Sequence, residues 1–436
     1  MSSAIADPRA MLDAAPMSRA QIGALAIVSA LSALDGYDTL AVSFAAPGIT
    51  RSWGLGMGAL GLVLSSGLLG MALGSFLLAP FADVIGRRRI VIVNLILMGG
   101  GMLLSAFATS IVWLAAWRVV TGIGIGSMVP IITPLAVEFS NGRRRAPAVA
   151  MMVIGYPLGA TLGGFAAAVL LHNFAWPSVF LFGAGVALLL LPIVILWLPE
   201  PLAFLMERRD GRSLDRVNAL LNRCNLGSVD SLPAPVARKN VAYREIFRPG
   251  RIGATLTMTL INLLYVMSVY YILSWLPQII AQAGYSASVA TAVSATANLC
   301  GAAMVILCAF AAARIRVHVL GSAMMIGLGL ATASFGLVQP TLLLLGLMGV
   351  LIGTFVHAGV FGLYATIVDK FDPAIRATGT GFVMGVGRGG AAFAPAIAGG
   401  LFSLGAGTGF VSVAFGALAL IAGLLLLWQG RLGRPI

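Results

Sequence analysis

Long apolar segments follow one another along most of the chain, and short polar stretches rich in arginine separate them. Roughly 20 apolar residues are enough for an α-helix to cross a bilayer, where the helix bonds its own backbone groups. The pattern predicts twelve transmembrane helices, at residues 21–47, 57–80, 90–109, 111–137, 147–170, 176–198, 252–280, 287–312, 317–337, 341–368, 376–401 and 408–429.

Composition supports the same fold class. Of the 436 residues, 59% are hydrophobic and only 9% are charged, whereas soluble domains carry about 25% charged residues. The chain is therefore predicted to be an all-α membrane protein. Residues 1–20 lack an apolar core followed by a cleavage site, so the first span is expected to remain in the protein.

The distribution of positive charge predicts the orientation. Twelve spans place both termini on one side of the membrane, and the loops on that side hold all but three of the 27 lysines and arginines. Arg51 lies on the opposite side, and Arg118 and Arg388 lie within spans. This asymmetry predicts cytoplasmic termini. The net charge of +13 is then mainly a topology signal, and no nucleic-acid binding is expected.

A polar stretch at residues 200–250 divides the predicted spans into two sets of six. We expect an N-terminal six-helix bundle at 21–199 and a C-terminal one at 251–430. Cytoplasmic segments are expected at 1–20 and 431–436. The stretch itself is expected to be a solvated cytoplasmic linker, and contact of its basic face with anionic lipid is the alternative.

The two halves look like repeats. At one common offset, Glu138 aligns with Asp369 and Arg145 with Arg376. Repeated six-span halves with a site between them are typical of alternating-access transporters. The spans that follow carry small residues at every fourth position, which predicts close helix packing, namely at Gly155, Gly159 and Gly163 and at Gly381, Gly385 and Gly389.

The first span contains the run Asp35, Gly36, Tyr37 and Asp38. The two acids are one helical turn apart and share a face, and Gly36 lets a neighbouring helix or a small anion come close. Carboxylates inside a membrane usually face a polar cavity and mark a substrate or proton path. The alternative is an ordinary polar helix end, but apolar residues continue on both sides. Asp35 and Asp38 are therefore the candidates for proton coupling.

Two arginines within spans are candidate partners for anions. Counting the helical rise places Arg118 about 10 Å from the outer edge of its span and Asp35 about 20 Å from the cytoplasmic edge, which are similar depths. Arg118 is therefore expected to pair with Asp35 or Asp38. Arg388 has no evident acidic partner in its own half and is expected to bind an anionic substrate. In the alternative, both arginines only connect helices through backbone carbonyls.

The remaining candidates carry weaker signals. Glu138 ends a span, so an ion pair with Arg143–Arg145 is the simplest expectation and proton coupling is the alternative. No cofactor, metal or catalytic site is expected, and the coupling ion would be the proton. Mid-span side chains could line a substrate pocket or simply pack, and these are Tyr37, Tyr156, Trp275, His357, Phe361 and Tyr364.

The loop from Ala82 to Arg89 resembles the loop signature of the major facilitator superfamily, with departures at Ala79 and Val84. Arg118 with Gly122 and Gly124 is similar to the span 4 motif of that superfamily, and the resemblance covers essentially the full chain. It implies the major facilitator fold, with two pseudo-symmetric six-helix bundles. It also implies a cytoplasmic gate in the loop, formed by Asp83, Gly86, Arg87, Arg88 and Arg89.

More narrowly, the run from Asp35 to Asp38 is similar to a motif of the aromatic acid:proton symporter family, and Ser274–Pro277 and Gly387-Arg388 fit the same family. This resemblance implies a monomer that imports aromatic carboxylates such as hydroxybenzoates, with protons, across a bacterial inner membrane. The alternative is an exporter or exchanger of organic anions or drugs. A third class, a membrane sensor or enzyme, has no soluble catalytic domain to support it.

Overall fold

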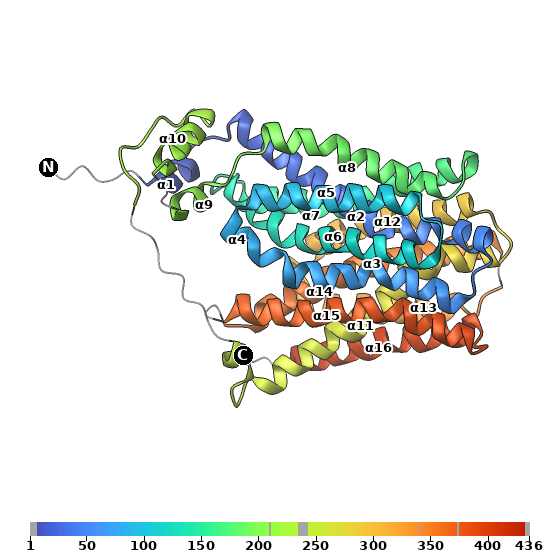
Figure 1. Cartoon of the computed structure of the whole chain (residues 1–436). Coiled ribbons are helices and arrows are strands. Elements are labelled where there is room, and N and C mark those ends of the chain that lie inside the picture. Colours follow the sequence, from blue (N-terminus) through green and yellow to red (C-terminus); the bar gives the residue numbers. More distant parts are fainter. Residues whose placement is uncertain (1–6, 209–210, 234–242, 340, 373–374, 432–436) are drawn as a thin grey trace.

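The computed structural model describes residues 7–208, 211–233, 243–339, 341–372 and 375–431. Within them, eleven helices are long and apolar enough to cross a membrane, and α15 (Arg376–Ser403) lies among these as a twelfth long helix (Figure 1). The eleven are α2 (Arg19–Trp53), α3 (Met57–Leu77, extended by η1, Ala79–Phe81), α5 (Arg87–Ala106), α6 (Ile111–Glu138), α7 (Arg145–Asn173), α8 (Pro177–Trp197), α11 (Ile252–Gln282), α12 (Ala287–Ala311), α13 (Val317–Phe335), α14 (Leu342–Lys370) and α16 (Thr408–Arg431).

The predicted all-α fold class is thus confirmed, and most helix ends lie within three residues of their predicted positions. The largest difference is at α2, which continues through Pro47 as far as Trp53. Its start is set by a capping box between Ser18 and Gln21, and its end by Gly54 in the left-handed conformation (φ 60°). Both are standard helix-terminating arrangements.

The helices form two halves with matching internal contacts. In the first half α2 packs on α7, α3 on α6, and α5 on both α6 and α8. In the second half the corresponding pairs are α11 with α15, α12 with α14, and α13 with both α14 and α16. Each pair of the first half is therefore reproduced in the second half by the helices that come six long helices later in the chain. This confirms the predicted pseudo-symmetry.

The halves meet mainly along three helix pairs, α3 with α15, α7 with α12, and α2 with α11. Named contacts gather at the end of the bundle opposite α1 and the C-terminal end of α16. There Ser65 Oγ accepts a hydrogen bond from Ala396 N (2.9 Å), and Ser288 Oγ donates one to Ala168 O (2.7 Å). In this conformation the two halves are therefore held together at that end.

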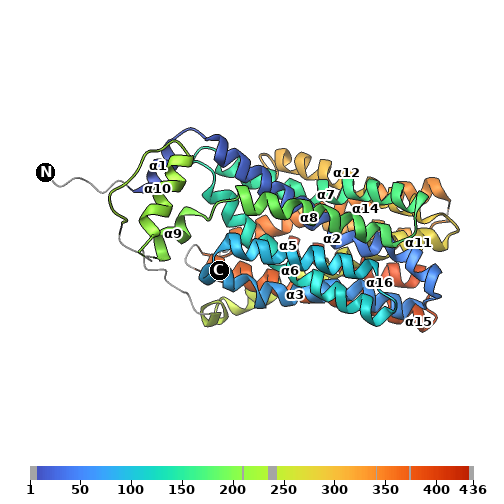
Figure 2. The same ribbon diagram turned by 45° about the horizontal axis from the view of Figure 1, so that its top comes forward.

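The stretch expected to be a solvated linker contains short helices in its described part. Short helices α1 (Pro8–Ala14), α9 (Leu202–Arg208) and α10 (Ser213–Arg223) lie together at one end of the bundle (Figures 1 and 2). They share a small apolar core that includes Leu12. α10 presents Val217, Leu220 and Leu221 to this core because these residues recur on one helical face. The segment after α8 is thus packed against the N-terminal segment. The other short helices are α4 (Ala82–Ile85) and η2 (Tyr243–Phe247).

The predicted close packing of small residues holds for one of the two stripes. In α7, a side chain at Gly155 or Gly159 would collide with the backbone oxygen of Ser29 or Ala33 in α2. In α15, by contrast, a Cβ at Gly381 or Gly389 would meet nothing within 4 Å. The prediction was therefore wrong for these α15 positions, and open space lies beside this face of α15.

Candidate functional site

The run from Asp35 to Asp38 lies near the middle of α2, and all four residues are buried. An ordinary polar helix end is therefore excluded. Gly36 lies directly against the backbone oxygen of Tyr156 in α7, where any Cβ would collide with it. The missing side chain thus allows a neighbouring helix to come close. This was one of the two possibilities expected for Gly36, the other being the approach of a small anion.

Asp38 forms the predicted ion pair with Arg118. Arg118 Nη1 donates to Asp38 Oδ1 (3.1 Å) and Nη2 donates to the Asp38 backbone oxygen (3.0 Å). The exposed fractions of the two side chains are 1% and 0%. The guanidinium also lies over the ring of Phe180, 5.6 Å from its centroid. This pair connects α2 to α6 inside the first half, and burial of both charges makes each depend on the other.

Asp35 has different surroundings, although it lies only one turn away. It is 1% exposed, and its Oδ1 atom has no hydrogen-bond partner among the described residues. The charged groups that interact with it electrostatically are Asp38, one turn away, and Arg388 of α15. Asp35 is therefore a buried carboxylate without a committed cation, at the boundary between the halves.

Three tyrosines join Asp35 to the second half. Tyr156 of α7 interacts with Thr39 and Asp35 of α2 and with Tyr270 of α11. Tyr270 in turn lies near Asp35, Arg388 and Tyr364 of α14. Because Tyr156, Tyr270 and Tyr364 all retain accessible surface, they offer aromatic faces and hydroxyl groups at the boundary between the halves.

Arg388 of α15 is the cation of this boundary. It is partly accessible, and its Nη1 atom donates to Ser75 Oγ of α3 and to Gly126 O of α6 (3.2 Å to Gly126). The arginine thus reaches from the second half to two helices of the first. This matches the alternative expectation, in which an arginine connects helices through backbone carbonyls. Its charge has no acidic partner in a direct ion pair within the described residues.

The other predicted pocket residues make packing contacts instead. Tyr37 donates its hydroxyl to Val179 O (2.6 Å) inside the first half, and Trp275 donates Nε1 to Pro395 O (3.2 Å) while fully buried. His357 Nε2 lies 3.0 Å from Asn298 Oδ1. Phe361 packs on the apolar cluster of Cys308, away from Asp35. Of the six, Tyr156 and Tyr364 join the cluster of Asp35 and Arg388.

Comparison with known proteins decides the family. The family model described as Major Facilitator Superfamily matches residues 26–395. This chain belongs to that superfamily. It is therefore a multi-pass membrane transporter and not an enzyme, and the resemblance seen in its loop and span 4 motifs is confirmed.

Its relatives include named transporters of aromatic acids. It is 30% identical to the gallate transporter of Pseudomonas putida, over 98% of this chain and 95% of that one. It is 30% identical to the 4-hydroxybenzoate transporter PcaK of Pseudomonas aeruginosa, over 92% of this chain and 90% of that one. It is 31% identical to the 3-(3-hydroxy-phenyl)propionate transporter of Escherichia coli, over 90% of this chain and 89% of that one.

Among solved structures, the chain is similar to the inward-open conformation of the xylose transporter XylE from E. coli. The TM-score is 0.72, at 14% identity, and the match covers 93% of this chain and 95% of that one. At that identity the likeness shows the fold alone.

The loop from Ala82 to Arg89 makes its contacts with other residues of the first half. Arg87 forms an ion pair with Glu138 at the end of α6, so the expected pairing of Glu138 with Arg143–Arg145 was wrong. Arg145 instead pairs with Asp13. The side chain of Asp83 lies outside the described part of the structure. Arg89 is exposed at the start of α5.

Glu200, just after α8, anchors the same loop. Its Oε1 accepts a hydrogen bond from Arg88 N (3.2 Å), and Arg88 also donates to Ile195 O. Gly86 has a φ of 117° and lies against the Glu200 carboxylate, so a side chain there would be both strained and crowded. Burial raises the pKa of Glu200, and hydrogen bonds from the Arg88 and Arg87 backbone partly oppose this effect.

Two residues at the boundary between the halves, Tyr270 of α11 and Ser75 of α3, were not predicted. Tyr270 and Tyr271 are neighbours, so their side chains leave α11 in directions about 100° apart. Tyr271 bonds Ser412 Oγ of α16 (2.8 Å), which leaves Tyr270 to face the boundary. The adjacent tyrosines were the available signal. Ser75 gave none, because an isolated serine in an apolar span usually bonds its own helix, as it also does here with Met71 O.

Proposed function

We propose that this protein imports an aromatic carboxylate with protons, by alternating access, across a bacterial inner membrane. The observation that carries the proposal is the boundary cluster, in which Asp35 and Arg388 come from opposite halves and Tyr156, Tyr270 and Tyr364 each interact with one or both of these charges. The relatives named for gallate, 4-hydroxybenzoate and 3-(3-hydroxy-phenyl)propionate support the substrate class. Those three acids share a hydroxylated ring and a carboxylate.

Arg388 is the proposed carboxylate-binding residue. A planar guanidinium can hold a carboxylate through two hydrogen bonds and remains charged throughout the cycle. The protein partners of Arg388 in this conformation are a hydroxyl and a backbone carbonyl of the first half. A substrate carboxylate is a stronger acceptor than either, so its arrival would draw Arg388 away from α3 and α6. Substrate binding would in this way change the contact between the halves.

The tyrosines are the proposed ring contacts. Tyr156, Tyr270 and Tyr364 can pack against an aromatic ring and bond its hydroxyl groups. Gly381 and Gly389 lie on the same helix as Arg388, and a Cβ at either would meet nothing within 4 Å, so no side chain of the protein packs against these two positions.

Asp35 is the proposed proton carrier, and Asp38 with Arg118 is its fixed support. A buried carboxylate without a cation is costly, and binding a proton removes its charge. When a substrate anion engages Arg388, the electrostatic surroundings of Asp35 change, which couples proton binding to substrate binding. Asp38 is less able to take up a proton because the guanidinium of Arg118 stabilises its charged form. The distribution of lysines and arginines supports cytoplasmic termini.

Binding to Arg388→Ala tests the substrate class. Hydrogen bonds to charged groups contribute about 1.5–3 kcal/mol, so the affinity for 4-hydroxybenzoate should fall about 10- to 100-fold. The affinity for the neutral 4-hydroxybenzamide should change little, because it carries no charge for Arg388 to bind. Titration calorimetry of the purified protein measures both.

The matched control is Arg314→Ala, which removes an exposed arginine from the loop after α12 and should leave both affinities unchanged. Equal losses of acid and amide binding in Arg388→Ala would show that the arginine is structural and would contradict the proposed carboxylate site.

A further inference from the structure

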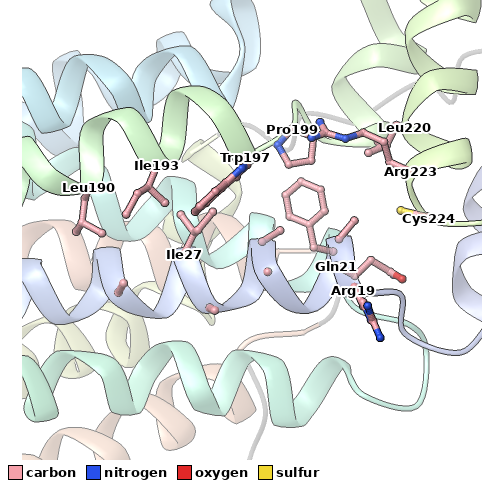
Figure 3. Close-up of a pocket in the computed structure, with 16 residues that line it drawn as sticks. Arg19, Gln21, Ile27, Leu190, Ile193, Trp197, Pro199, Leu220, Arg223 and Cys224 are labelled. Atoms are coloured by element: carbon pink, nitrogen blue, oxygen red, sulfur yellow. The ribbon is translucent and has the colours of Figure 1, made fainter.

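A groove of about 540 Å³ lies outside the boundary cluster, where the start of α2 meets the end of α8 and α10 (Figure 3). Its walls are mostly apolar and include Ile27 of α2 and Ile193 and Trp197 of α8. Trp197 is 64% exposed. Exposed apolar side chains on a membrane-spanning helix face lipid, and tryptophan is enriched where the hydrocarbon core meets the headgroups. The groove therefore opens toward the bilayer.

The polar end of the groove is positively charged. Arg19 of α2 and Arg223 of α10 both line it, and Figure 3 shows them at the end away from Leu190. Both are exposed, and neither forms an ion pair in the part of the chain that the structure describes. Two arginines at one end of an apolar groove complement a molecule with an anionic head and an apolar body.

A buried polar atom in the same wall also lacks a partner. Gln21 is 2% exposed, and its Oε1 accepts a hydrogen bond from Ser18 N (2.8 Å) as part of the capping box. Its Nε2 atom has no hydrogen-bond partner among the described residues. A buried donor without an acceptor is unfavourable, and this one belongs to a residue that lines the groove next to Arg19 (Figure 3).

We propose that this groove binds an anionic phospholipid, with its phosphate near Arg19, Arg223 and Gln21 and an acyl chain along α2 and α8. A soluble anion would leave the apolar wall uncovered, whereas a lipid matches both ends and is supplied by the bilayer at this depth. Because α10 belongs to the segment between the halves, the bound lipid would fasten that segment to the first half. The site is independent of the transported substrate.

Native mass spectrometry of the delipidated protein tests this site. Phosphatidylglycerol should bind more tightly than phosphatidylcholine with the same acyl chains. Removing both arginines in Arg19→Ala/Arg223→Ala should weaken phosphatidylglycerol about 10- to 30-fold, from the attraction of a basic residue for an anionic headgroup. Arg19→Lys/Arg223→Lys should retain most of the preference. Arg314→Ala/Arg316→Ala, which removes the same charge from the same end of the bundle outside the groove, should leave it unchanged.

A second variant tests the apolar part of the groove. Gly23 lines the groove, and a Cβ there would meet nothing within 4 Å. Gly23→Leu should therefore fold normally, place its side chain in the groove and weaken both lipids. Thermal unfolding of each variant checks that the fold is intact.

Three outcomes would overturn the proposal. One is wild-type phosphatidylglycerol binding by both the arginine and the Gly23→Leu variants. Another is equal affinity of the wild-type protein for the two lipids. The third is displacement of phosphatidylglycerol by glycerol phosphate at similar concentration, which would assign the arginines to a soluble anion.

Discussion

Asp35 and Asp38 are one helical turn apart in α2 but have different partners. Arg118 bonds Oδ1 and the backbone oxygen of Asp38, whereas Asp35 has no ion pair among the described residues. One carboxylate oxygen of each residue, Asp35 Oδ1 and Asp38 Oδ2, has no hydrogen-bond partner there. The same substitution should therefore have different consequences at the two positions. This difference separates the structural contribution of a buried carboxylate from its proposed contribution to proton coupling.

Asp38→Asn should lower the free energy of unfolding, because it leaves the Arg118 charge buried without its counter-charge. Breaking a buried pair in this way costs about 3–5 kcal/mol. Asp35→Asn removes no ion pair and should unfold within a few degrees of the wild-type protein. Thermal unfolding of the two purified variants measures the difference, and equal stability would show that the Asp38–Arg118 pair does not stabilise this half.

At the scale of helices, the contact of α2 with α7 depends on small residues. Gly36 lies against the backbone oxygen of Tyr156, and this contact places Tyr156 next to Thr39 and the boundary cluster. Any side chain at position 36 must push the two helices apart, since a backbone atom cannot rotate out of the way.

Gly36→Ala should therefore reduce transport severely and lower the unfolding temperature. Gly23→Ala adds the same methyl group to the same helix where nothing lies within 4 Å, and it should match the wild-type protein in both measurements. Uptake and thermal unfolding of the two variants check this, and a fully active Gly36→Ala would show that the close approach of α2 and α7 is dispensable.

The loop before α5 provides a prediction on pH. The raised pKa of Glu200 means that the folded protein holds this proton more tightly than the unfolded chain does, above the ordinary value of 4.5. The wild-type protein should then lose stability relative to Glu200→Gln as pH rises from about 4.5 toward neutrality. Below this range both carry a neutral side chain and their curves should converge. Thermal unfolding across pH measures the difference, and a wild-type gain with rising pH would contradict the burial effect.

Helix ends and one ion pair could be predicted from the sequence, because both depend on how far along its own helix each residue lies. Counting the rise placed Arg118 at the depth of the α2 acids, and the pair forms with Asp38. Rotation about the helix axis was not accessible in this way, so Tyr270 was missed. The α10 core was missed for another reason. The charged residues of 200–250 concealed a helix whose apolar positions recur at helical spacing.

At the scale of the whole molecule, the site lies where the two halves face each other. Asp35 and Tyr156 come from the first half, and Tyr270, Tyr364 and Arg388 from the second. The halves are held together at the end opposite α1, while Arg388 bonds across the boundary to α3 and α6. A ligand that engages Arg388 therefore acts on the contact that must change when access alternates.

Uptake of labelled 4-hydroxybenzoate into proteoliposomes, with and without an inward proton gradient, tests whether substrate import is coupled to protons. Accumulation should require the gradient, collapse with a protonophore, and be abolished in Asp35→Asn, although that variant should still exchange substrate across the membrane. Loss of preloaded substrate when protons are placed outside, or accumulation by Asp35→Asn equal to that of the wild-type protein, would contradict this coupling.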